Sequence, residues 1–279
     1  MQPKNIIGFI DGYKGTKLYY SFYQVPESRA RIIFLHGAGE YSEKYTRFAE
    51  WFKSEDIEVG LLDLRGHGRS GGPRCHIDDF NDYALDLDIT IKFFEKNYDA
   101  KNIFLVSHSL GGLIAIYYSI NFHYSLRGIV SCSPCLGLRL KVEPIKGWLA
   151  NVFYPVLKNI PFSTRIKPKM ATHDISFIER FRGDPFIRHT VTASFYVQMA
   201  KAMRYVRSHA DRFSAPILIL QAGADKICDP KAAENFCKIV NSRDSEFKLY
   251  EGFYHEILNE QGKEKAFGDI YNWIKARCE

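Results

Sequence analysis

The chain has 279 residues, of which 46% are hydrophobic and 25% charged, and its formal net charge is +6. This length can bury a large core, and α/β domains of this size are often single. No apolar run approaches the roughly 20 residues that span a bilayer, and no recognised nucleic-acid-binding motif accompanies the positive charge. Composition therefore argues against both a membrane-spanning and a nucleic-acid-binding protein.

Strand and helix signals alternate from residue 31 onward, which predicts a mostly parallel sheet flanked by helices. Short apolar or alternating runs predict strands at 17–24, 31–35, 58–63, 102–106, 126–132, 216–221 and 246–250. Amphipathic or apolar stretches predict helices at 45–54, 80–97, 110–121, 190–207, 231–240 and 262–277.

The alternation is interrupted between residues 138 and 212, where no strand pattern appears. Because this segment is too long for a plain loop, we expect a helical cap at 138–212, inserted into a core formed by 1–137 and 213–279. The apolar run at 146–162 either packs the cap onto the core or lines an acyl-chain pocket. The cap carries 14 Lys and Arg against 5 Asp and Glu, which suits a solvated face or an anionic membrane surface.

Ser109 lies between the apolar strand at 102–106 and a helix that begins at once with Leu110. The run Ser107-His-Ser-Leu-Gly111 has the form G-x-S-x-G, with serine in place of the first glycine. A serine on such a turn points its hydroxyl above the sheet, and the helix N-terminus favours developing negative charge. The pattern predicts a nucleophile elbow with Ser109 as the nucleophile.

A catalytic serine needs a histidine to take its proton and a carboxylate to orient that histidine. After such an elbow the partners follow in the order Ser, Asp or Glu, His, each just after a strand. Asp225 follows the strand at 216–221, and His255 follows the strand at 246–250. We therefore predict a triad of Ser109, Asp225 and His255.

Each partner has a competitor in the sequence. Asp229 precedes a proline and the helix at 231–240, which is typical of a helix N-cap. His67 lies in a glycine-rich turn typical of a loop histidine, and His108 points off the elbow. We therefore prefer His255 as the base.

The tetrahedral intermediate of acyl transfer needs two backbone N–H donors. One comes from the residue after the nucleophile, which is Leu110. The other comes from the loop after an early strand, and the turn His36-Gly-Ala-Gly39 aims the amide of Ala38. The same turn also serves simply to link strand to helix.

Five ordered motifs resemble the monoacylglycerol lipase and lysophospholipase branch of the α/β-hydrolases, which is serine aminopeptidase S33-like. They are His36-Gly-Ala-Gly-Glu-Tyr-Ser42, Asp63-Leu-Arg-Gly-His-Gly-Arg-Ser70, Ser107-His-Ser-Leu-Gly-Gly112, Gln221-Ala-Gly-Ala-Asp-Lys-Ile-Cys-Asp229 and Tyr250-Glu-Gly-Phe-Tyr-His255. The resemblance implies an α/β-hydrolase fold with an inserted helical cap, and the same triad and oxyanion donors. It also implies that the polar head of the substrate meets Glu40.

Two positions depart from the family pattern. Lys44 replaces an arginine, and Leu258 stands where a second histidine contacts the glycerol end. These changes leave ester hydrolysis intact, but we expect Glu40 and Lys44 to recognise the head group loosely.

The sequence thus predicts a serine hydrolase that cleaves carboxylic esters of single-chain lipids. A short-chain carboxylesterase, a thioesterase, an acyltransferase or an S33-type aminopeptidase would use the same triad. The aminopeptidase is disfavoured because no acidic cluster for a substrate amine is evident. A binding protein that has lost catalysis is disfavoured because all three triad members are present. The sequence does not indicate an oligomeric state.

Six cysteines are scattered along the chain. Because the first residues lack the pattern of a signal peptide, we expect reduced thiols in a cytoplasmic protein, with possible peripheral membrane contact through the basic cap. Cys132 and Cys135 have the spacing of a redox pair, but they lack the helix or second pair that redox or zinc sites need. The predicted mechanism requires no cofactor or metal.

Overall fold

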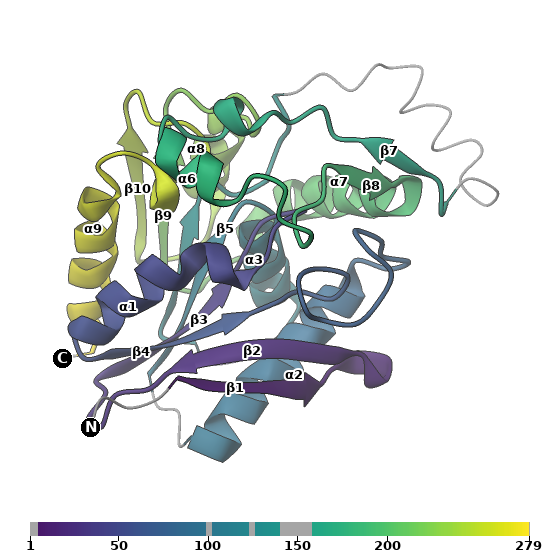
Figure 1. Cartoon of the computed structure of the whole chain (residues 1–279). Helices are drawn as coiled ribbons and strands as arrows, with labels where there is room; N and C mark the ends of the chain where they lie inside the picture. The colour runs from purple at the N-terminus through teal and green to yellow at the C-terminus, as the bar shows by residue number, and fades with distance from the viewer. Residues whose placement is uncertain (1–4, 99–101, 123–125, 140–157, 279) are drawn as a thin grey trace.

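The computed structural model describes residues 5–98, 102–122, 126–139 and 158–278. Its centre is an eight-stranded sheet with the order β1-β2-β4-β3-β5-β6-β9-β10 (Figure 1). The strands are β1 (Ile6–Asp11), β2 (Lys17–Tyr23), β3 (Ala30–Leu35), β4 (Ile57–Leu62), β5 (Ile103–His108), β6 (Gly128–Cys132), β9 (Ile217–Ala222) and β10 (Ser245–Tyr250). The pairs β1–β2 and β2–β4 are antiparallel, whereas every neighbouring pair along β4-β3-β5-β6-β9-β10 is parallel. The prediction of an α/β fold with a mostly parallel sheet is confirmed.

Helices cover both faces of this sheet, so the core has two layers. They include α1 (Thr46–Ser54), α2 (Asn81–Tyr98), α3 (Leu110–Asn121), α8 (Pro230–Ile239) and α9 (Lys263–Lys275). Alternate residues of β3 point to opposite faces: Ile33 and Leu35 pack with α2 and α3, whereas Ile32 and Phe34 pack with α1 and α9. Because both faces of the sheet are buried, the central strands are continuous apolar runs.

β1 was missed by the sequence analysis. Strand signals depend on alternation of apolar and polar residues, and the run from Ile6 to Ile10 places Ile7 and Phe9 on the exposed side, with 64% and 55% of their surface accessible. Apolar residues on both faces, interrupted by Gly8, therefore hid the strand.

The segment at 158–212 contains β7 (Pro161–Ser163), α6 (Ile175–Arg180), β8 (Thr190–Thr192) and α7 (Ala193–Ser208). β7 and β8 pair antiparallel, so the expectation of no strand here was wrong. Three-residue strands are too short to leave a periodic signal. The predicted helix at 190–207 begins instead at Ala193, because the Thr192 side chain accepts a hydrogen bond from the amide of Phe195 and caps it. Residues 140–157, with most of the apolar run at 146–162, lie outside the described residues.

Candidate active site

Ser109 occupies the turn between β5 and α3 with φ 52° and ψ −111°. A positive φ is strained for a non-glycine residue and persists only where its surroundings hold it. The Ser109 amide donates to the carbonyl of Cys132 at 3.0 Å, and its carbonyl accepts from the amides of Gly112 and Leu113 at 3.0 and 3.2 Å. Strand and helix together therefore hold the serine in the sharp turn that the sequence predicted.

Close packing of α3 on the sheet explains the two glycines after the serine. A Cβ at Gly111 would lie 2.2 Å from the carbonyl oxygen of Leu35, and one at Gly112 would lie 2.3 Å from Ser131 Oγ. Ser107, which replaces the first glycine of the motif, is fully buried and donates its hydroxyl to the Val130 carbonyl at 3.1 Å. Its polar atom is satisfied, so a serine is tolerated there.

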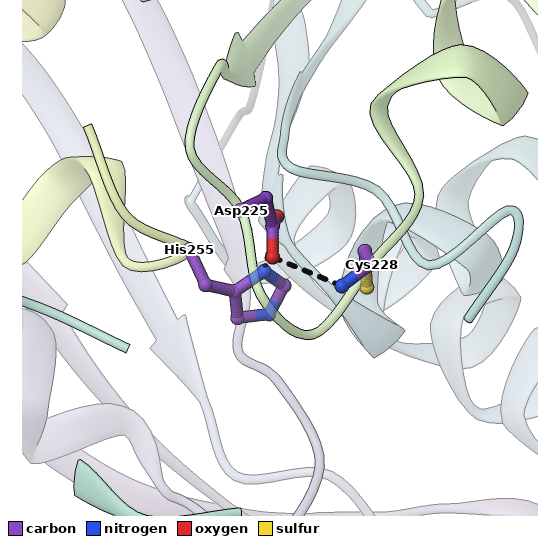
Figure 2. Close-up of side chains that lie close together, drawn as sticks. All are labelled: Asp225, Cys228 and His255. Carbon is purple, nitrogen blue, oxygen red and sulfur yellow. Dashed lines mark hydrogen bonds and ion pairs between the residues drawn. The ribbon is translucent and has the colours of Figure 1, made fainter. Parts of the chain in front are cut away.

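The loops after β9 and β10 bring Asp225 and His255 together. His255 Nδ1 donates to Asp225 Oδ2 at 2.7 Å, and the other carboxylate oxygen accepts from the amides of Ile227 and Cys228 at 2.8 and 2.9 Å. Figure 2 shows the carboxylate beside the imidazole and the hydrogen bond from Cys228. With Nδ1 engaged, Nε2 is the nitrogen left for a reacting serine, and Ser109 and His255 line the same cavity.

Burial and charge act in opposite directions on this pair. Burial lowers the pKa of His255, but the charge and hydrogen bond of Asp225 outweigh it and raise the pKa above its usual value of 6.5. Burial raises the pKa of Asp225, but the charge of His255 and the hydrogen bonds to the carboxylate bring it below its usual 3.8. Asp225 is therefore ionised at neutral pH and stabilises an imidazolium on His255.

The competing residues have other partners. The Asp229 side chain accepts from the Lys231 amide at 3.0 Å and caps α8, as predicted. His67 Nδ1 donates to the Arg65 carbonyl at 3.0 Å, and burial lowers the pKa of His67 to about 3. The sequence indicated a loop histidine, and the structure adds that it is buried.

The loop after β3 lies directly against the serine. A Cβ at Gly37 would lie 3.2 Å from Ser109 Cβ, and Ala38 lines the cavity. His36 fixes this loop: its Nδ1 donates to the Gly37 carbonyl at 2.7 Å, and its Nε2 accepts from the Leu64 amide at 3.0 Å. Burial lowers the pKa of His36 to about 4, so it stays neutral in this role.

The two predicted oxyanion donors flank Ser109 from different elements. Ala38 belongs to the loop after β3, and Leu110 is the first residue of α3. Within the described residues, neither amide donates a backbone hydrogen bond. Both amides are therefore available to a substrate oxygen.

Glu40 and Lys44, the predicted head-group residues, line the cavity but are buried and bound to each other. Lys44 Nζ also contacts Glu256 at 2.8 Å. Glu40 accepts from the Gly37 amide at 2.5 Å, from the Tyr45 hydroxyl and from His108 Nδ1. Burial raises the pKa of Glu40, but Lys44 and His108 outweigh it and hold that pKa well below its usual value. Through the Gly37 amide, Glu40 therefore also fixes the loop that carries Ala38.

Sequence reasoning missed Glu256, the role of His36 in fixing the loop after β3, and the hydrogen bond between His108 and Glu40. Glu256 meets Lys44 across 212 positions, and no short-range pattern carries such a contact. The only local sign that Glu256 belongs to the site is its position directly after His255, the predicted base.

Ser109 and His255 open into a cavity of about 540 Å³. Its apolar wall comes largely from the segment between β7 and β8, with Val191 of β8 and Ile227 of the loop after β9. The residues from that segment are Ile166, Ala171, Phe177, Ile178, Phe181 and Ile187. An apolar cavity with a few polar groups at one end is the usual form of a site for a small amphipathic ligand.

Asp225, Cys228 and His255 also offer ligand atoms within 4.8 Å of one another, as a metal site would require (Figure 2). Two of them already form the short Asp–His hydrogen bond, which a metal ion would disrupt. The Cys135 side chain forms a hydrogen bond with that of Cys228. The hydrogen bond between Asp225 and His255 is the arrangement that the sequence predicted for acid–base chemistry.

Comparison with known proteins agrees with this geometry. The family model described as serine aminopeptidase, S33, matches residues 26–262. The chain is 30% identical to a monoglyceride lipase of Rattus norvegicus, over 94% of this chain and 88% of the relative. It is also 30% identical to phospholipase YtpA of Bacillus subtilis, over 85% and 92%. A crystal structure of Paleococcus ferrophilus monoacylglycerol lipase superposes with a TM-score of 0.85 at 26% identity, covering 93% of this chain and 99% of that one.

Fold, family model and relatives thus agree with one another. The chain belongs to the S33 serine aminopeptidase family, in the monoacylglycerol lipase branch of the α/β-hydrolases.

Proposed function

We propose that this protein is a serine hydrolase that cleaves carboxylic esters of single-chain lipids. The observation that carries the proposal is the position of Ser109, on a strained turn at an apolar cavity that it shares with the hydrogen-bonded pair of His255 and Asp225. The monoglyceride lipase and phospholipase relatives support the same chemistry.

His255 Nε2 takes the proton of Ser109 as the oxygen attacks the ester carbonyl. The amides of Ala38 and Leu110 stabilise the oxyanion, and His255 then protonates the departing alcohol. Water, activated by the same histidine, hydrolyses the acyl-enzyme and regenerates Ser109. These steps require no cofactor.

The substrates proposed are monoacylglycerols and lysophospholipids. The apolar wall between β7 and β8 suits one acyl chain, and Glu40, Lys44 and Glu256 form a polar end. An aminopeptidase is disfavoured, because a substrate amine needs an unpaired acid and both carboxylates contact Lys44.

Residues 138–212 are proposed to act as the cap over this cavity, and their excess of basic residues to contact membranes peripherally. No helix among the described residues is long and apolar enough to cross a bilayer. Cys75, Cys132, Cys135, Cys228 and Cys237 are thiols rather than disulfides, which supports a cytoplasmic location.

The test is the variant Ser109→Ala, compared with Ser54→Ala on the exposed end of α1. Ser109→Ala should lose hydrolysis of a monoacylglycerol by about 10⁴-fold or more, and it should lose labelling by a fluorophosphonate. Ser54→Ala should keep both. Near wild-type hydrolysis of p-nitrophenyl esters by Ser109→Ala would rule out the proposed nucleophile.

A further inference from the structure

The acidic and the basic side chains that line the cavity come from different parts of the chain and differ in exposure. Lys167, Lys169, Arg182 and Arg188 are exposed and line it on the segment between β7 and β8. Among the described residues, the acids that line it are Glu40 and Glu256. Positive charge therefore predominates at the water-facing part of the cavity.

Among the described residues neither acid forms an ion pair with these cations, because both are buried and bound to Lys44. Arg182 pairs with Glu179. Lys167, Lys169 and Arg188 form no ion pair within the described part of the chain. Three cationic groups thus face the cavity without a protein counter-charge.

Arg188 is also fixed close to the reacting centre. Its amide donates to the Gly39 carbonyl at 2.7 Å, and Gly39 follows the proposed oxyanion donor Ala38. The main chain at Arg188 is therefore tied to the loop beside Ser109, whereas its guanidinium extends from an exposed position. In an ester bound at Ser109, the acyl chain would lie along the apolar residues of the segment between β7 and β8, and a head group extending toward water would meet its exposed cations.

We propose that the preferred substrates are single-chain lipid esters whose head group is anionic. This proposal rests on the function proposed above and refines it. Guanidinium and ammonium groups bind phosphate oxygens through charge-assisted hydrogen bonds. A low-dielectric cavity wall strengthens such attraction at its mouth. A cationic head would meet like charges there, because both acids are already paired.

The test compares three decanoyl esters as monomers: the neutral ester of glycerol, the zwitterionic ester of glycerophosphocholine and the anionic ester of glycerophosphoglycerol. At low ionic strength kcat/KM should be about tenfold higher for the anionic ester than for the neutral one. Most of this preference should disappear in about 1 M salt, where the screening length falls to about 3 Å.

The variant Lys167→Gln/Lys169→Gln/Arg188→Gln should bring the ratio of anionic to neutral kcat/KM toward one. Its control, Lys96→Gln/Arg243→Gln/Lys275→Gln, removes the same charge from exposed positions that do not line the cavity. The control should keep the wild-type ratio.

A wild-type ratio of one or less, or a ratio kept by the cavity variant, would overturn the proposal. So would a preference that appears only above the critical micelle concentration, since that result assigns the cations to adsorption on a lipid surface. Cleavage of none of the esters, with no fluorophosphonate labelling of Ser109, would instead refute the proposed function.

Discussion

At the residue scale, Asp225 and Asp229 lie four positions apart and have separate roles. Asp225→Asn should lower kcat by about 10³- to 10⁴-fold, because an amide cannot hold the imidazole in the required tautomer or stabilise its charge. Asp229→Asn should keep full activity, since asparagine caps a helix about as well as aspartate. Steady-state kinetics and thermal unfolding of both variants are the measurements. Loss of activity in the Asp229 variant alone would reassign the acid.

The pH dependence follows from the raised pKa of His255. Only the neutral imidazole acts as base, so kcat/KM should fall as the pH drops through an apparent pKa above 6.5. The contribution of the Asp225–His255 ion pair to stability has the opposite pH dependence. It is fully present below pH 6.5 and is lost as the pH rises through the pKa of His255 in the folded protein.

A pH profile of kcat/KM with a water-soluble ester measures the first effect, and unfolding over the same range measures the second. An activity inflection at or below 6.5 would show that Asp225 does not dominate the environment of His255.

At the scale of elements, α3 packs too closely on the sheet to accept a side chain at its start. Gly111→Ala would place a Cβ 2.2 Å from the Leu35 carbonyl oxygen, so we expect a loss of about 1–3 kcal/mol in unfolding free energy, with reduced kcat. Gly268→Ala in α9, where an added Cβ would meet open space, should instead gain about 0.5–1 kcal/mol. Denaturant unfolding measures both, and equal effects would contradict this explanation.

Local pattern explains which elements could be predicted. The central strands are buried on both faces and are therefore visible as apolar runs, and the Asp229 cap marks the start of α8. β1, β7 and β8 could not be found in this way. β1 shows apolar residues on both faces, and the other two have three residues each.

The same distinction applies to the candidate site. Ser109, Asp225 and His255 each follow a strand, so a short window of sequence identifies them. The contact of Lys44 with Glu256 and the packing of Gly37 against Ser109 depend on how distant segments meet. No window of a single sequence contains that information.

At the scale of the whole molecule, the cavity of about 540 Å³ has room for a single acyl chain. Each further buried methylene should add about 0.8 kcal/mol, or roughly fourfold in kcat/KM, until the wall is filled. We therefore expect a steep rise along a series of monoacylglycerols from acetyl to decanoyl, and little action on triacylglycerols. Kinetics below micelle formation measure the series. A flat response with preference for acetyl esters would identify a short-chain esterase.

The hydrogen bond from the Arg188 amide to the Gly39 carbonyl has a mechanical consequence. This hydrogen bond connects the segment before β8, which lines the cavity, to the loop that carries the Ala38 amide. We expect a head group too large for the cavity to displace this wall and, through the same hydrogen bond, to displace the Ala38 amide from the position it needs to bind the oxyanion. Oversized substrates would then still bind but react slowly, so the enzyme would reject them through kcat rather than KM.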